Sequence, residues 1–403
     1  MTFASRLSPN AAHGMLFVHA ALVQIVSYGL RAAIAYELLA LGQEGAWLGY
    51  SAAAFALPPL VLALPSGRLV RRFGERVSMV IGAVALLLAV AAVLGYGTSA
   101  VGLIAASALL GCGVLFSVVG EQSWVMSAVP NRGLDFAFGM YTLATSTGQM
   151  LGPLVLLIRS PGGGAGAAAG HAPPAMTAIA WLCFGISAAI LLFSACVPPS
   201  APGKGGAAPG GVFSLLRRPG VPSALFASSI VLTSLDIAIM YLPLLAEGRG
   251  ISAGWVSAML VARGAATMVS RLTLSAMTRR FGRRTVLVGG GAVAGLALLS
   301  LVFPLPAPLI LVACVLYGLA AGTVQPLTMS WMTLITSLDQ RSMAASLRLL
   351  GNRIGQTGVP LIAAGVSAVG GAAAGFGCVG AGLLVGAVLS RAAPNDRPPR
   401  ATP

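Results

Sequence analysis

Residues 71–74 read Arg-Arg-Phe-Gly, and the same four residues return at 279–282, which is 208 positions later. Further matches keep nearly the same offset and the same order in both halves of the chain. They are Gly42 and Trp47 with Gly250 and Trp255, Ser123 and Trp124 with Ser330 and Trp331, and Gly148, Gln149 and Pro153 with Gly355, Gln356 and Pro360. A repeat of about half the chain predicts two copies of one bundle of membrane helices, an arrangement typical of transporters.

The composition indicates that most of the chain lies in lipid. Of 403 residues, 57% are hydrophobic and only 8% are charged, and the mean hydropathy is +0.91. Apolar stretches of about 20 residues, long enough to cross a membrane as helices, follow one another along the chain. We therefore expect an all-α membrane protein with twelve transmembrane helices in two pseudo-symmetric bundles of six. The expected spans are 15–38, 46–65, 77–97, 100–128, 135–158, 175–196, 221–246, 252–276, 285–303, 308–335, 343–368 and 372–390.

Two segments between the expected spans differ in composition from the rest. Residues 159–174 are rich in Gly, Ala and Pro, and residues 197–220 are rich in Gly and Pro and carry three basic residues. We expect the first to be an outer loop and the second to link the two halves. The predicted domains are an N-terminal six-helix bundle at 1–196, a cytoplasmic linker at 197–220, and a C-terminal six-helix bundle with a short cytoplasmic tail at 221–403.

The net charge of +15 follows from topology and does not require a nucleic-acid partner. Of the 24 Lys and Arg residues, 17 fall at the N-terminus, in the even-to-odd connections between spans and in the C-terminal tail, whereas only Arg159 and Arg249 lie in the opposite loops. The positive-inside rule therefore places both termini in the cytoplasm. We expect a multi-pass protein of the inner or plasma membrane, embedded in the lipid bilayer, with no nucleic-acid partner and acting as a monomer.

Ionisable residues inside the expected spans point to functional positions, because burying a charge in lipid costs at least ~2.5 kcal/mol. Asp236 and Arg263 lie near the middle of neighbouring spans, and Glu121 lies in the inner half of the fourth span with no basic residue within two turns. One interpretation is a buried ion pair between Asp236 and Arg263 that secures the second half. The other is that Asp236 or Glu121 carries a proton during transport. Glu121 is the better candidate, since Arg263 offers Asp236 a partner.

Polar and aromatic side chains inside the spans are expected to line a cavity for the solute, although each could also serve only to hold helices together. Arg271 and Arg348 lie close to the inner ends of their spans, so we expect them to anchor helices at the membrane surface. The excess of Arg over carboxylates favours an amphipathic or anionic organic solute. The residues expected at the cavity are Gln24, Tyr28, Arg31, Trp124, Gln149, Gln325, Trp331, Asn352, Arg353 and Gln356.

No enzymatic site is expected from the sequence. The histidines, His13, His19 and His171, lie at no metal-ligand spacing from one another, from Cys or from an acid. No Gly-rich loop ends in Lys-Ser or Lys-Thr for binding ATP. We therefore expect no metal and no cofactor.

Residues 67–76, between the second and third spans, resemble the signature loop of the major facilitator superfamily, and residues 275–284 resemble its second copy. The resemblance covers nearly the whole chain and implies a transporter that works by alternating access. Where the family usually has an acid before the Arg, this chain has Arg71 and Arg279, and Glu75 is the candidate substitute. The resemblance implies that these loops control exchange between inward and outward states, whereas a structural interpretation is that they set topology and bind anionic lipid head groups. The residues concerned are Gly67, Arg71, Arg72, Gly74, Arg279, Arg280 and Gly282.

Residues 148–153 of the fifth span read Gly-Gln-Met-Leu-Gly-Pro and resemble the superfamily motif of drug and proton antiporters, although leucines stand where the motif usually has further glycines. Gly148 and Gly152 make a smooth face for close helix contact, and Pro153 can bend the helix. Packing alone would also explain this pattern. Because Gly355 and Pro360 occupy equivalent places in the eleventh span, we expect both halves to bend at equivalent depths.

These features predict a secondary active transporter of small organic molecules, and the antiporter-like motif favours a proton-coupled exporter. Two alternatives stay open. One is proton-coupled uptake of an organic anion or nutrient, and the other is a transporter-like membrane sensor or scaffold that moves no solute. The internal acids Glu121 and Asp236 argue against the last of these.

Overall fold

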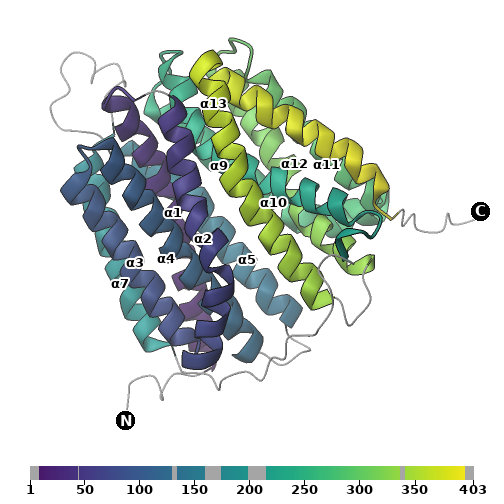
Figure 1. Cartoon of the computed structure of the whole chain (residues 1–403), viewed down its shortest axis with the longest axis horizontal. Coiled ribbons are helices and arrows are strands. Elements are labelled where there is room, and N and C mark those ends of the chain that lie inside the picture. Colours follow the sequence, from purple (N-terminus) through teal and green to yellow (C-terminus); the bar gives the residue numbers. More distant parts are fainter. Residues whose placement is uncertain are drawn as a thin grey trace, which may run out of the picture.

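The computed structural model describes residues 9–43, 45–128, 134–158, 174–197, 215–335 and 341–394, and these are almost entirely helical (Figure 1). The helices before residue 198 are α1 (Pro9–Ala40), α2 (Gly45–Phe73), α3 (Glu75–Tyr96), α4 (Ala100–Ala128), α5 (Leu134–Leu151), the 3-10 helix η3 (Gly152–Leu157) and α7 (Met176–Cys196). Those after residue 214 are α9 (Val221–Glu247), α10 (Ala253–Phe281), α11 (Arg283–Ser300), α12 (Ala307–Leu334), α13 (Arg341–Leu389) and the 3-10 helix η5 (Ser390–Ala392).

The expected twelve spans are present among the described residues. There are eleven α-helices, and α13 consists of two helices joined at Gly371, which has non-helical backbone angles. Eight of the described helices are long and apolar enough by composition to cross a membrane. α5, α10 and α11 are outside that group. α10 is interrupted by Arg263 and Arg271, and α5 is rich in Thr and Ser, so polar side chains reduce the apolar character of both helices.

The backbone repeats the duplication seen in the sequence. A single residue separates α2 from α3 and α10 from α11, and these residues are Gly74 (φ 85°) and Gly282 (φ 81°). Gly42 (φ 72°) and Gly250 (φ 64°) likewise follow the first helix of each half. Because residues with a side chain rarely adopt positive φ, glycine is needed at these corners. The duplicated glycines therefore mark equivalent turns in the two halves.

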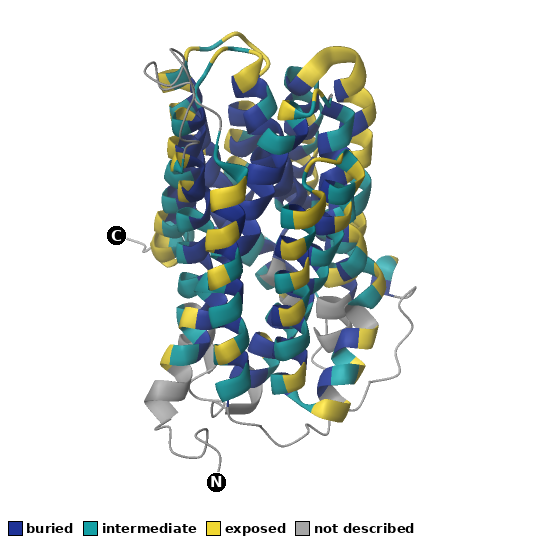
Figure 2. Cartoon of the chain, turned by 90° about the vertical axis from the view of Figure 1, so that its left-hand side faces the viewer, coloured by how far each residue is buried: buried dark blue, intermediate teal, exposed yellow. Residues whose placement is uncertain are grey.

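Two groups of helices lie side by side, purple to teal for the first part of the chain and green to yellow for the second (Figure 1). Contacts between the groups join α2 with α13, α5 with α10, and α1 with α9. The division at 1–196, 197–220 and 221–403 stays a prediction, because most of the expected linker lies outside the described residues. In Figure 2 the buried residues are densest away from the N-terminus.

One end of the interface between the groups is closed by close packing of α2, α9 and α13. The hydroxyl of Tyr241 donates a hydrogen bond to the carbonyl oxygen of Gly45 (3.1 Å) and lies 3.4 Å from the hydroxyl of Ser367. A Cβ atom on Gly49 would lie only 2.7 Å from the carbonyl oxygen of Pro360. Glycine therefore allows the backbones of α2 and α13 to approach closely here.

Candidate functional site

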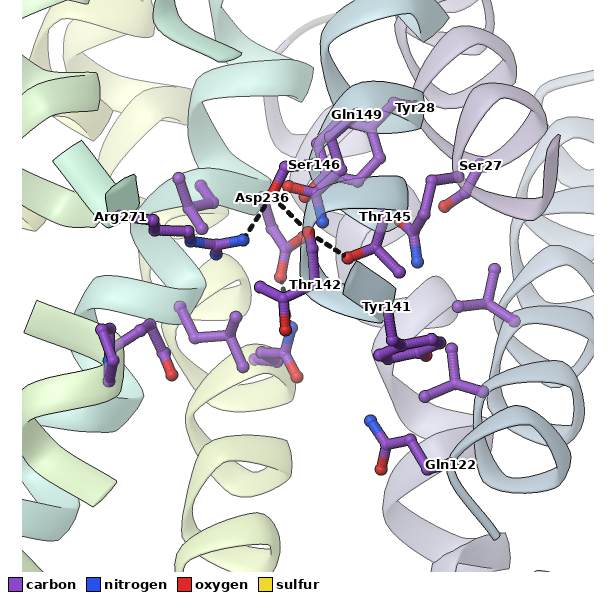
Figure 3. Close-up of a pocket in the computed structure, with 18 of the residues that line it drawn as sticks. Ser27, Tyr28, Gln122, Tyr141, Thr142, Thr145, Ser146, Gln149, Asp236 and Arg271 are labelled. Atoms are coloured by element: carbon purple, nitrogen blue, oxygen red, sulfur yellow. Dashed lines mark hydrogen bonds between the residues drawn. The ribbon is translucent and has the colours of Figure 1, made fainter. Parts of the chain in front are cut away.

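A cavity of about 670 Å³ lies between the two groups of helices, and eight helices contribute to its wall. This volume lies within the usual range of pockets for small organic molecules. Figure 3 shows several of its side chains directed toward a common space. The polar and charged residues of the wall are Gln24, Ser27, Tyr28, Arg31, Gln122, Tyr141, Thr142, Thr145, Ser146, Gln149, Asp236, Arg271, Gln325, Arg348, Arg353 and Gln356.

The cavity lies toward the end of the bundle that carries the basic corners at residues 71–76 and 279–284. α4 and α12 contribute residues from their centre and C-terminal halves, and α5 contributes residues 141–149, the middle of the span that α5 and η3 form together. The opposite end is closed by the packing around Gly49 and Tyr241. The structure therefore has one closed end and a cavity offset toward the other.

A buried ion pair crosses the cavity between the two groups of helices. Arg31 Nη1 of α1 donates to Asp236 Oδ1 of α9 at 2.7 Å, and the two side chains are 2% and 7% exposed. Gln356 of α13 donates to the other carboxylate oxygen at 2.8 Å, and its own carbonyl oxygen accepts a hydrogen bond from Arg353 (2.9 Å). Asp236 thus connects α1, α9 and α13.

The expected pair between Asp236 and Arg263 is wrong in this structure, because the carboxylate is bonded to Arg31 and Gln356. α9 packs mainly on α13, so Asp236 faces across the molecule and not along its neighbour in sequence. The guanidinium of Arg263 lies 5.9 Å from the ring centroid of Tyr28, and its Nε and Nη2 atoms are buried with no hydrogen-bond partner. A second guanidinium, that of Arg31, lies 4.1 Å from the ring centroid of Phe55.

Arg271 and Arg348, which we expected to anchor helix ends, both lie on the cavity wall. Arg271 donates to the hydroxyl of Ser146 at 2.5 Å (Figure 3), and Arg348 donates to the hydroxyl of Ser228 at 3.0 Å. The wall therefore carries four arginines and one aspartate. This excess of positive charge suits a solute with an anionic or electron-rich group.

A second buried site lies beside the cavity and within the first group of helices. Glu121 of α4 and His19 of α1 are both 0% exposed, and Oε1 lies 2.7 Å from Nδ1. Tyr141 of α5 donates to Glu121 Oε2 at 2.9 Å, and Ser194 of α7 lies 2.9 Å from His19 Nε2. The sequence analysis missed His19 because its partner lies on another helix. Its position inside an expected span, where ionisable residues are rare, was the available signal.

Seven of the ten residues expected at the cavity lie on its wall, namely Gln24, Tyr28, Arg31, Gln149, Gln325, Arg353 and Gln356. The other three are placed elsewhere among the described residues. Trp124 packs with Leu16, Met79, Val125 and Val197. Trp331 is fully buried in the main hydrophobic core, and Asn352 is 3% exposed. The indole rings of Trp124 and Trp331 fill space between helices. The sequence pattern alone does not distinguish such a packing role from lining a cavity.

The glycine motif of the fifth span packs against α1. A Cβ atom on Gly148 would collide with the carbonyl oxygen of Ala21, and one on Gly152 would lie 2.8 Å from Cβ of Tyr28. Gly355 approaches the hydroxyl of Ser229 on α9, which is the equivalent contact in the second half. The close contact predicted from these glycines is therefore present in both halves.

The two prolines near these glycines behave differently. At Pro153 the α-helix gives way to the 3-10 helix η3, whereas α13 continues as an α-helix through Pro360. The two prolines were expected to bend their helices equivalently, but only the first lies where an α-helix changes to a 3-10 helix. The hydroxyl of Ser257 on α10 donates to the carbonyl oxygen of Pro153 at 2.9 Å, which ties η3 to the second group.

The corner residues of the signature loops lie away from the cavity. Arg72, Arg279 and Arg280 are exposed, and the guanidinium groups of Arg72 and Arg280 lie 5.2 and 5.4 Å from the rings of the phenylalanines that follow them. Gly67 and Gly74 have open space around them, because a Cβ atom on either residue would meet nothing within 4 Å, whereas Gly282 is buried. The side chain of Arg71 lies outside the described residues. No group of three potential metal ligands occurs among the residues that the structure describes.

Comparison with known proteins agrees with this architecture. The sequence model of the Major Facilitator Superfamily matches residues 16–267 and again residues 224–403. The chain is 27% identical over 335 residues to a protein named multidrug efflux pump Tap from Mycolicibacterium fortuitum, over 78% of this chain and 79% of that protein.

Similar solved structures share the fold at low sequence identity. A mutant of the nucleoside transporter NupG has a TM-score of 0.76 at 13% identity, covering 94% of this chain and 98% of that chain. A D-xylose-proton symporter has a TM-score of 0.76 at 15% identity, covering 95% and 97%. The inward open conformation of the xylose transporter XylE from E. coli has a TM-score of 0.73 at 14% identity, covering 96% and 98%.

Proposed function

The chain belongs to the Major Facilitator Superfamily, a family of membrane transporters and not of enzymes, and we propose that it exports small organic molecules in exchange for protons. The observation that carries the proposal is the cavity between the two groups of helices, closed at one end and crossed by the pair of Arg31 and Asp236. A solute bound there touches both groups at once. Rocking of one group against the other would then expose it to alternate sides of the membrane.

The proposed orientation places the basic corners, both termini and the linker 197–220 in the cytoplasm of an inner or plasma membrane. In this orientation the closed end around Gly49 and Tyr241 faces outward and the cavity is offset toward the cytoplasm. The structure would then represent an inward-facing state. Cysteine labelling from either side of intact cells tests the orientation, and a linker labelled from outside would contradict it.

For solute binding we propose roles for both charged and uncharged residues of the wall. Arg31, Arg353 and Asp236 would form the charged centre, with Gln356 holding the carboxylate in place. Gln24, Tyr28, Gln149 and Gln325 would supply hydrogen bonds and an aromatic surface around it. A solute group that bonds to Arg31 competes with Asp236, so binding would weaken a link between the two groups of helices.

The direction of transport and its driving force are each supported by separate observations. Export is supported by the likeness to a protein named as a multidrug efflux pump and by the antiporter-like motif at 148–153. Proton coupling is supported by the buried carboxyl groups of Glu121 and Asp236.

Purified protein in liposomes tests the proposal with two dyes of opposite charge, ethidium and carboxyfluorescein. Protease access measures the fraction of molecules that are inserted with their cytoplasmic side on the outside of the liposome. A pH gradient of either sign is then imposed. We expect gradient-dependent accumulation of at least one dye, abolished by a protonophore. Equal distribution of both dyes under every gradient, in liposomes that still hold their gradient, would contradict export of amphipathic organic molecules.

Uptake of an organic anion is the second candidate function, and the four arginines on the cavity wall favour it. The two functions differ in the sign of the gradient that drives accumulation. An exporter that exchanges solute for protons moves the solute in the direction opposite to the proton flow. A symporter moves the solute in the same direction as the protons. The same liposomes therefore separate them.

A further inference from the structure

A set of four side chains joins four helices of the first group at a site beside the cavity. His19 lies on α1, Glu121 on α4, Tyr141 on α5 and Ser194 on α7, and each is hydrogen-bonded to another member of the set. His19, Glu121 and Ser194 are all 0% exposed. Of the four, only Tyr141 also lies on the cavity wall.

The hydrogen-bond partners determine how many protons the set holds. The hydroxyl of Ser194 donates to the carbonyl oxygen of Ile190 at 2.8 Å, so it must accept from His19, and Nε2 is the protonated nitrogen. Tyr141 donates its own proton to Glu121 Oε2. One further proton then accounts for the short contact between Nδ1 and Oε1. Whether it sits on nitrogen or on oxygen, the pair of His19 and Glu121 has no net charge.

Among the described side chains, few charged or titratable groups lie near the pair on the helices that pack against it. α1 adds Arg31 three turns from His19, α4 adds Cys112, and α7 adds Cys196. α3 adds Glu75 and Arg76 in its first turn, and the carbonyl oxygen of Glu75 faces Gly120. α5 adds Tyr141 itself. Loss of the shared proton would therefore leave a negative charge in a fully buried site without a cation bonded to it.

We infer that His19 and Glu121 form the proton-binding site of this transporter and that Tyr141 connects the site to the solute cavity. The inference rests on the proton coupling proposed above. In the release step the Tyr141 hydroxyl turns its hydrogen from Glu121 Oε2 toward water in the cavity, and the carboxyl rotates so that Oε2 carries the shared proton. That proton passes to the Tyr141 oxygen as the hydroxyl gives its own proton to the water. The site ends as neutral imidazole and carboxylate, and Tyr141 ends as a hydroxyl. A solute that contacts Tyr141 thereby changes the bonding of Glu121.

The proton site is tested first without any solute. [15N]Histidine NMR of the purified wild-type protein, recorded from about pH 5 to about pH 8, reports the protonation of His19. We expect the His19 signals to change with bulk pH and to lose that response in Glu121→Gln. Glu37→Gln is the matched control, since it removes a carboxyl of α1 that lies outside the set, and it should leave the His19 signals unchanged. Signals of His19 that stay constant over this range in the wild type would show a purely structural link and overturn the inference.

Transport then tests the coupling in the liposomes described above, with the dye that the wild type accumulates. His19→Gln and Glu121→Gln should lose gradient-driven accumulation while exchange of dye for dye continues. Tyr141→Phe should slow gradient-driven accumulation on the order of 100-fold, the usual contribution of one positioned proton donor. Variants at His19 or Glu121 that still concentrate dye would overturn the inference. If the wild type itself moves neither dye, the proposed function fails while the NMR titration still decides whether the pair exchanges a proton.

Discussion

Gly74 and Gly282 hold the same corner in the two halves, whereas Glu121 corresponds to Thr328, whose hydroxyl donates to the carbonyl oxygen of Gln325 in its own helix. The same contrast appears elsewhere. Gly148 and Gly355 make equivalent contacts with the first helix of their own half. Glycines that set the backbone path were thus kept in both halves, because the same turn and the same close approach need the same small residue.

The charged residues diverged between equivalent positions. At the offset of 208, Asp236 corresponds to Tyr28 and Arg263 corresponds to Phe55. Tyr28 and Phe55 each lie against a guanidinium, that of Arg263 and that of Arg31. The first half therefore supplies aromatic faces and the buried set around Glu121, and the second half supplies most of the charge at the cavity. Repeated geometry has been combined with different chemistry in each copy.

The largest expected effect comes from the pair that joins the halves. Asp236→Asn leaves Arg31 buried without its carboxylate, and removing one partner of a buried pair costs ~3–5 kcal/mol. Arg31→Gln should cost less, because Arg353 remains connected to Asp236 through Gln356. Thermal unfolding in detergent measures both. An equal fall in the thermal midpoint for the two variants would show that Gln356 and Arg353 do not help to stabilise the carboxylate of Asp236.

An intermediate effect is expected from the equivalent glycines 148 and 355. Gly148→Ala places a methyl group against the backbone carbonyl of Ala21, which cannot rotate away, so overpacking should cost ~1–3 kcal/mol. Gly355→Ala meets the hydroxyl of Ser229, which can turn aside. The thermal midpoint should therefore fall more for Gly148→Ala. The reverse order would mean that the contact between α1 and α5 is looser than its counterpart.

A smaller and symmetric effect is expected at the two corners. Gly74→Ala and Gly282→Ala force a side chain into positive φ, with an expected cost of ~1 kcal/mol or more each. Gly67→Ala is the matched control, because Gly67 lies in the last two turns of α2, just before the first corner, without positive φ and with open space around it. We expect the corner variants to slow dye transport while dye binding, measured by fluorescence anisotropy, is retained. Equal loss of binding would show that the corners shape the cavity.

The smallest effect is expected from cutting the chain between residues 198 and 214. Contacts of α2 with α13 and of α5 with α10 join the two groups independently of that segment. Halves expressed together should therefore assemble and be recovered by a tag on either one. Recovery of the tagged half alone would contradict the two-bundle division.

The sequence was sufficient for the spans, the duplication and the glycine contacts, because hydropathy, helix length and residue size act locally along the chain. Partners across the bundle were harder to predict. One of the two interpretations paired Asp236 with Arg263 on the adjacent span, but Asp236 bonds to Arg31 because facing helices need not be consecutive in sequence. His19 was overlooked for the same reason. Trp124 and Trp331 were misplaced because a buried aromatic ring has the same sequence pattern whether it fills a core or faces a cavity.

The closed end of the bundle is held by contacts between neutral groups, with glycine backbones of α2 set against Tyr241, Ser367 and Pro360. Such contacts are short in range and are not screened by dissolved ions, unlike attraction between exposed charges. The rate at which this end opens should therefore be nearly independent of ionic strength outside the membrane. Concentrated salt and dilute buffer would act on this face alike, so a change of salt concentration would not open this end of the protein.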